Sequence, residues 1–254
     1  ENAKFNFDKF SEVVEDGVVY LNEVLDEGLK LHPLEEQRKS VRKYRQIGLG
    51  IMGLATMFIK MGIRYGSDES IEIIHKIGDI LANKSLQTSS LLAKENGSFS
   101  AYNEKYVLNS NYINNVANEK TINMIKKYGL RNSQLTVIAP TGSTSNLVSV
   151  SGGIEPIFDI SYMRKTESLH NDEVEYEVFT PIVEEYMKNK NIKDKEKLPD
   201  YFVTAHTLDY KERVDVQSAW QKYIDASISS TINLDNSASI EKIKDIYMYS
   251  WLQG

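Results

Sequence analysis

The stretch with the clearest potential for chemistry is a short hydroxyl-rich turn near the middle of the chain. Its residues are small and uncharged: Pro140, Thr141, Gly142, Ser143, Thr144 and Ser145. It follows Leu135–Ala139, an apolar run typical of a buried strand, and Pro140 ends that strand because proline has no N–H for a ladder. Free N–H groups in the first turn of a following helix can hold an anion. The pattern therefore predicts a phosphate-binding loop.

The same turn has a structural alternative, since serine and threonine hydroxyls commonly cap helices without binding any ligand. Two nearby residues are candidates for further roles. Glu155 lies in Ser151–Pro156, which we expect to line the same mouth, but acid/base catalysis needs a placed partner and none is evident, so we expect a supporting role. His206 follows a short apolar run and is interpreted as a packing residue.

A literal G-x-G-x-x-G occurs at Gly48–Gly53 and raises the alternative of a dinucleotide-binding enzyme. That fingerprint requires a preceding buried strand, whereas Arg42–Gln46 is strongly polar. Ser67-Asp68-Glu69 stands where a ribose-binding acid would be sought, but it is typical of a helix start. We expect the glycines to let a strand and a helix pack closely. A non-catalytic α/β interaction module is a further alternative.

The composition excludes several classes of function. The 254 residues carry a net charge of −6 and contain no cysteine, which rules out disulfides, thiolate metal sites and thiol chemistry within this chain. Lysine and arginine are scattered, so we expect no nucleic-acid surface, and histidines and acids show no metal-ligand spacing. There is no long apolar run and no targeting segment, so we expect no membrane span and a cytoplasmic location. Residues 1–254 are expected to form a single unit.

Four stretches, in order, carry a resemblance to a known family. APTGSTSN followed by SGGIEP (residues 139–156) resembles the substrate-phosphate loop of the large, catalytic chain of ribonucleotide reductases, most closely the adenosylcobalamin-dependent class II branch. The other three stretches agree with it: RQIGLGIMGLA at 45–55, TAHTL at 204–208 and QKYIDASISSTINL at 221–234.

The resemblance implies an oxidoreductase that reduces ribonucleotides to deoxyribonucleotides by radical chemistry, with adenosylcobalamin as cofactor. It assigns substrate-phosphate binding to Pro140–Ser145. The family's radical and reducing cysteines have no counterpart here, so we expect no catalytic residue in this chain and an inactive isolated piece. The chain begins at Glu1 and stops at Gly254, and we expect it to be a C-terminal part of the parent. Implied partners are the ribonucleotide, the remaining chain and, for the parent, a second copy.

The pattern of elements predicts an α/β protein with parallel strands, and the resemblance implies the second half of a ten-stranded barrel with its last strand beyond Gly254. Met163–Glu177, including His170, is expected to be a charged loop, and Asp8 to cap the first helix. Short helices are expected within 98–118. Longer helices are expected at 8–29, 67–95, 119–128, 181–189, 214–228 and 239–252, and further strands at 157–162, 201–205 and 230–234.

Overall fold

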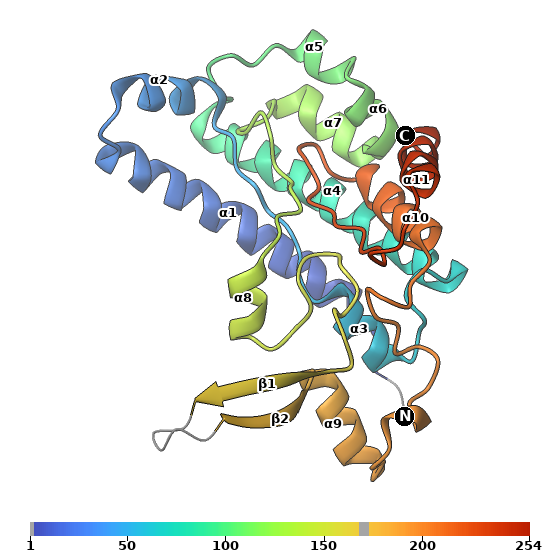
Figure 1. The fold of residues 1–254 in the computed structure, drawn as a ribbon. Helices are drawn as coiled ribbons and strands as arrows, with labels where there is room; N and C mark the ends of the chain where they lie inside the picture. The colour runs from blue at the N-terminus through green and yellow to red at the C-terminus, as the bar shows by residue number, and fades with distance from the viewer. Residues whose placement is uncertain (1–2, 168–172) are drawn as a thin grey trace.

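The structure is a computed structural model that describes residues 3–167 and 173–254. Figure 1 shows a group of helices at one end, a two-stranded hairpin with helix α9 at the other, and the short helix α8 between them. The helices are α1 Phe7–Leu31, α2 Glu35–Tyr44, α3 Leu54–Met61, α4 Asp68–Asn96, α5 Glu104–Leu108, α6 Asn111–Val116, α7 Glu119–Tyr128, α8 Gly142–Leu147, α9 Pro181–Lys190, α10 Tyr210–Gln221 and α11 Ile240–Leu252, and the strands are β1 Ser161–Glu167 and β2 Glu173–Phe179.

Most helices begin where a side chain can satisfy their first amides. Ser67 caps α4 by accepting from Ser70 N, and Asn118 caps α7 by accepting from Thr121 N. The predicted cap of α1, Asp8, was wrong. Asn6 is the N-terminal cap, since its side chain accepts from Lys9 N, and Asp8 lies inside the first turn. Helix α10 starts earlier than expected, because Asp209 accepts from Lys211 N and caps it at Tyr210.

Parallel pairing is present, but as isolated bridges and not as long strands. Leu49 bridges to Thr136, and two residues further Ile138 bridges to Ile228, so the segment after Leu135 lies between two parallel neighbours. A separate parallel bridge joins Ile157 to Thr204. The expected strands at 157–162, 201–205 and 230–234 are therefore wrong in extent. The third is also wrong in position, since Ile228 precedes it and Ser230–Leu234 has no regular structure.

The segment interpreted as a charged loop forms an antiparallel hairpin. Ser161 pairs with Phe179, and Tyr162 with Val178, in the register of β1 with β2. The sequence of β2 alternates acidic and apolar residues, which is the period of a strand with one solvated face. The segment was interpreted as a loop because it is rich in charged residues, and this alternation was overlooked. His170 lies outside the described residues.

The core consists of two groups of buried apolar side chains, and the long helix α4 contributes residues to both. One group contains Phe58, Tyr65, Ile138 and Trp220, and packs beside the central bridges. The other, with Leu135 among its members, is covered by α5, α6 and α7. Helix α4 contacts α1, α7 and α10, so it spans both groups (Figure 1).

The Gly48–Gly53 motif is explained by packing. A Cβ on Gly50 would lie 2.2 Å from the carbonyl oxygen of Val137, and one on Gly48 would lie 2.7 Å from the Val137 side chain. Gly53 has φ of +85° and precedes α3. The glycines at 48 and 50 thus permit close approach, as expected, but the elements they bring together are two parallel segments and not a strand and a helix.

We predict that Gly50→Ala destabilises the protein by about 1–3 kcal/mol, because the new methyl group must displace backbone. Gly28→Ala is the control: its Cβ would have nothing within 4 Å, and it lies inside α1, where alanine should stabilise by about 0.5–1 kcal/mol. Urea denaturation of the two variants and the wild type measures both effects. Equal stability of Gly50→Ala and wild type would contradict the packing explanation.

Candidate functional site

The hydroxyl-rich loop lies directly after the central parallel segment. Ile138 is bridged to Ile228 and accepts from Ser229 N (2.8 Å), and Pro140 follows two residues later at the carboxyl end. Helix α8 begins at Gly142, with Thr141 as its N-terminal cap residue in the left-handed region at φ of +51°. This is the turn and helix start that the sequence predicted; the predicted strand before it, Leu135–Ala139, is reduced to single bridges at Thr136 and Ile138.

The backbone amides of Gly142, Ser143 and Thr144 are the donors that this loop offers. They lie in the first turn of α8, where a helix supplies no acceptor for them, and they have no other hydrogen-bond acceptor in the described part of the chain. All three residues are exposed. The hydroxyls of Ser143 and Thr144 are exposed with them, so amides and hydroxyls together can surround an anion.

The two remaining hydroxyls serve the loop itself. Thr141 Oγ1 accepts from Gly153 N (2.8 Å), and the buried Ser145 Oγ donates to Gly142 O (3.3 Å). Pro140 has no N–H and lies exposed at the edge. Of the six predicted phosphate-binding residues, three present free amides, and Thr141 and Ser145 instead fix their geometry.

The returning segment passes close to the loop because it contains two glycines. A Cβ on Gly152 would lie 3.2 Å from Pro140 O, and one on Gly153 would lie 3.1 Å from Ala139 O. Gly153 also has φ of +42°, a conformation that favours glycine. The Ser-Gly-Gly stretch at 151–153 therefore packs directly against the backbone of Ala139 and Pro140, at the start of the loop.

Helix α3 supports the loop through paired hydrogen bonds. Ser151 N donates to Thr56 Oγ1 (2.9 Å), and Thr56 N donates to Ser151 Oγ (3.3 Å). Gly53 N donates to Ser151 O (2.8 Å). Two amides at the start of α3, those of Gly53 and Thr56, are therefore occupied by protein and not free for a dinucleotide pyrophosphate, which disfavours the dinucleotide alternative.

A cleft of about 630 Å³ opens beside the loop. Its wall includes Gly142, Ser145 and Asn146 from the loop, and its lining residues include no lysine, arginine or histidine. Two carboxylates line it: Asp159 accepts from Ile160 N (2.7 Å), whereas Glu155 has no hydrogen-bond partner among the described residues. The anion-binding capacity of this cleft therefore comes from backbone amides and hydroxyls.

Sequence reasoning missed part of this cleft. Tyr162 and Val178 of the hairpin, and Thr180 and Ile182 at the start of α9, line its far side. The alternating pattern of β2 was the available signal for the hairpin. His206 has a packing contact at the rim, with its ring edge-on to Phe158 at 4.9 Å between centroids.

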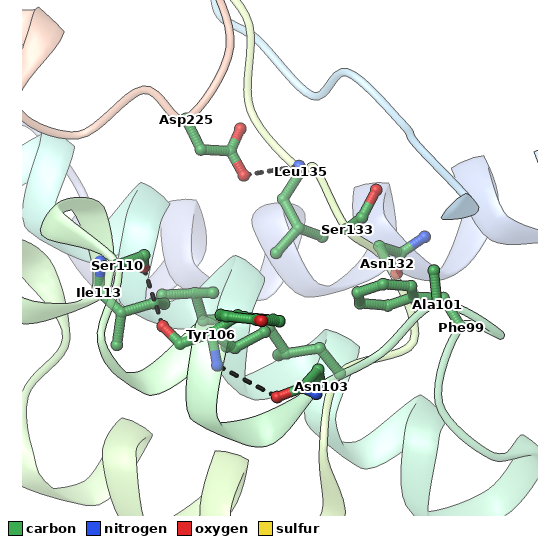
Figure 2. A pocket seen from close by; sticks show the side chains of 13 residues that line it. Phe99, Ala101, Asn103, Tyr106, Ser110, Ile113, Asn132, Ser133, Leu135 and Asp225 are labelled. Atoms are coloured by element: carbon green, nitrogen blue, oxygen red, sulfur yellow. Dashed lines mark hydrogen bonds between the residues drawn. The ribbon is translucent and has the colours of Figure 1, made fainter. Parts of the chain in front are cut away.

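A second cavity, of about 270 Å³, lies at the opposite, amino end of the central segment. Figure 2 shows Asp225 directed at the Leu135 amide, with Asn103 and Tyr106 across the cavity. The Asp225 carboxylate accepts from Leu135 N and Thr136 N, both at 2.8 Å. Burial raises the pKa of Asp225, and these hydrogen bonds oppose that rise. In α/β proteins ligands bind at the carboxyl ends of strands, so this cavity is the less favoured site.

The described residues also bear on metal binding and on membrane insertion. Residues 3–167 and 173–254 contain no group of three or more histidine, aspartate or glutamate side chains placed to hold a metal ion. No helix in the same ranges has the length and apolar character that crossing a bilayer requires.

Fold and loop together define an α/β protein that presents free amides at the carboxyl end of a parallel segment. Residues 1–254 match the family described as "Ribonucleotide reductase, barrel domain", and the chain belongs to the ribonucleotide reductase family. The resemblance noted in the sequence is thereby confirmed. The matching relatives include both vitamin B12-dependent enzymes and others without that designation.

Three relatives show the range of similarity. The chain is 33% identical over 97% of its length to a vitamin B12-dependent ribonucleoside-diphosphate reductase of Thermoplasma acidophilum. It is 26% identical over 98% to one of Mycobacterium tuberculosis, and 27% identical over 100% to the ribonucleoside-diphosphate reductase large subunit of Arabidopsis thaliana. It covers 32%, 35% and 34% of these proteins, so it spans a third of their length.

We predict that Thr141→Val lowers the free energy of unfolding by about 1–3 kcal/mol, because the buried Gly153 N–H loses its acceptor. Valine keeps the branched Cβ, so the backbone strain at φ of +51° is unchanged. The exposed Thr144→Val is the matched control and should stay within about 0.5 kcal/mol of wild type. Denaturation midpoints would measure the difference, and an equal effect of both substitutions would refute the role given to Thr141.

Proposed function

We propose that these residues form part of the catalytic chain of a ribonucleoside-diphosphate reductase, an oxidoreductase, and that they hold the phosphates of its ribonucleotide substrate. The observation that carries the proposal is the exposed, unpaired set of amides at Gly142, Ser143 and Thr144, of which Gly142 lines the cleft. Membership of the reductase family supports the substrate class, and the printed names of the relatives favour a diphosphate.

The contribution of this segment is substrate placement. Fixing a reactant in a productive orientation can lower a barrier by about 7–11 kcal/mol in favourable cases. Because residues 1–254 contain no cysteine, any thiol used in the reaction comes from elsewhere in the protein. We therefore infer that the phosphate end of the substrate rests on Gly142–Thr144 and its ribose faces polypeptide outside this segment.

The B12-dependent relatives suggest adenosylcobalamin as the parent's cofactor, which would supply the radical when bound. The amides and hydroxyls of the described cleft suit a phosphate and include no group specific for a corrin, so no step is assigned to that cofactor here. We also infer that the bridged segments around Leu49, Thr136 and Ile228 belong to the second half of a ten-stranded barrel that the remaining chain completes.

We predict that Ser143→Asp in the full-length protein weakens ribonucleoside diphosphate binding by about ten-fold or more, because a carboxylate within a few ångströms repels phosphate. An acidic residue in the first turn of a helix is favourable for the helix itself, so stability should be kept. Ser239→Asp is the control: it adds the same charge at the N-terminal cap of α11, away from the cleft.

Isothermal titration calorimetry with a ribonucleoside diphosphate measures the affinity, and a thermal melt confirms that each variant is folded. Unchanged affinity in a folded Ser143→Asp variant would refute the phosphate site. An equal loss in Ser239→Asp would show that overall charge, and not the loop, governs binding.

A further inference from the structure

A buried arginine on α10 lacks hydrogen-bond acceptors for two of its three guanidinium nitrogens, as far as the described residues show. Arg213 is only 3% exposed, and its Nε donates to Thr231 O at 3.3 Å. Its two terminal nitrogens, Nη1 and Nη2, are buried and have no acceptor in the described part of the chain. A guanidinium is charged at every accessible pH, and a buried charge without a partner is strongly destabilising. We therefore expect a negatively charged group beside the Arg213 guanidinium.

The acidic residues on α10 and at its cap are all engaged elsewhere. Asp209 caps the helix by accepting from Lys211 N. Glu212 forms an ion pair with Arg64, and Asp215 accepts from Tyr249 Oη (2.7 Å). None of these carboxylates serves as counter-ion to the guanidinium that lies among them in the sequence.

Two polar side chains near the guanidinium are those of Tyr65 and Glu155. Tyr65 Oη donates to Ile154 O (2.5 Å), and burial raises the pKa of Tyr65 to about 12; the charge of Arg213 and its contact with the phenol oppose that rise, and the charge of Glu155 adds to it. Tyr65 is therefore a neutral phenol at physiological pH. Glu155 lines the phosphate cleft, whereas Arg213 lines a separate small cavity, and only Pro156 is common to both linings.

This separate cavity has a volume of about 10 Å³, which is room for about one particle of the size of a water molecule. It is too small for a phosphate or a nucleotide. No carboxylate is among its lining residues, which are Pro156, Ala205, Leu208, Tyr210, Arg213, Thr231, Ile232 and Asn233.

We propose that the terminal nitrogens of Arg213 bind one small monovalent anion of the halide class in this cavity. The anion neutralises the guanidinium and draws together α10, the segment around Thr231 and Pro156, which is also part of the phosphate cleft. Since it binds only the folded state, it stabilises the protein by mass action. The site is independent of the phosphate loop and of the proposed reductase function.

The test uses the full-length protein. Crystals are soaked in sodium bromide and the anomalous scattering of bromine is mapped, while thermal melts compare sodium chloride or bromide with sodium gluconate at equal ionic strength. Melts are repeated for Arg213→Met and for the control Arg131→Met, whose guanidinium already donates to Asn96 O and Gly97 O (both 3.0 Å).

We expect a bromide peak within hydrogen-bond distance of Nη1 and Nη2. Halide should raise the Tm over gluconate by about 2 °C or more in wild type and Arg131→Met, and this increment should vanish in Arg213→Met. Water or the Glu155 carboxylate at these nitrogens, or an equal increment in Arg213→Met, would overturn the proposal. If Arg213→Met does not fold, the bromide map of the wild-type protein decides alone. A map without a peak beside Nη1 and Nη2 would then overturn the proposal.

Discussion

The arrangement depends on how the start of one central segment is held. The backbone amides of Leu135 and Thr136 donate to the Asp225 carboxylate and not to a backbone carbonyl. The same carboxylate also accepts from Thr136 Oγ1 at 3.1 Å. Burying a carboxylate is costly unless hydrogen bonds compensate it, and here three donors do so. Beyond this anchor the segment is bridged on both sides and then enters the proposed phosphate loop, so the position of the loop is set at the other end of the same segment.

The stretch from Ser151 to Pro156 connects the loop to the rest of the molecule. Ser151 is joined to Thr56 by reciprocal hydrogen bonds, Gly153 N donates to Thr141, and Ile154 O accepts from the buried Tyr65. Each bond reaches a different element, so displacement of this stretch would break contacts with α3, α8 and the core at once. The neighbouring segments are paired through isolated bridges and not through long strands. These side-chain hydrogen bonds are therefore what holds the exposed amides in a rigid position.

Helix positions could be predicted from the sequence because their signals are local: Ser67 and Asn118 are caps, and Pro181 fits a first turn. Strands could not be delimited, because the parallel segments bridge at single residues, such as Leu49 with Thr136, and propensity cannot show where pairing stops. The site was located by composition and by family resemblance. The left-handed Thr141, whose hydroxyl accepts from Gly153 N, depends on a contact between residues well separated in the sequence, which no local pattern encodes.

Binding phosphate through neutral amides, as proposed for Gly142–Thr144, would suit a reaction that changes only the sugar. Phosphates are identical in a ribonucleotide and its reduced product, so the proposed contacts at Gly142–Thr144 would bind both equally, and uniform binding does not by itself raise the rate of the chemical step. A lysine or arginine here would tighten substrate and product alike and slow release. The cleft lining instead includes Glu155 and Asp159 and no cationic side chain, which limits affinity. The value of the loop then lies in orientation, which requires the rigid support that Thr56, Tyr65 and Gly153 give to it.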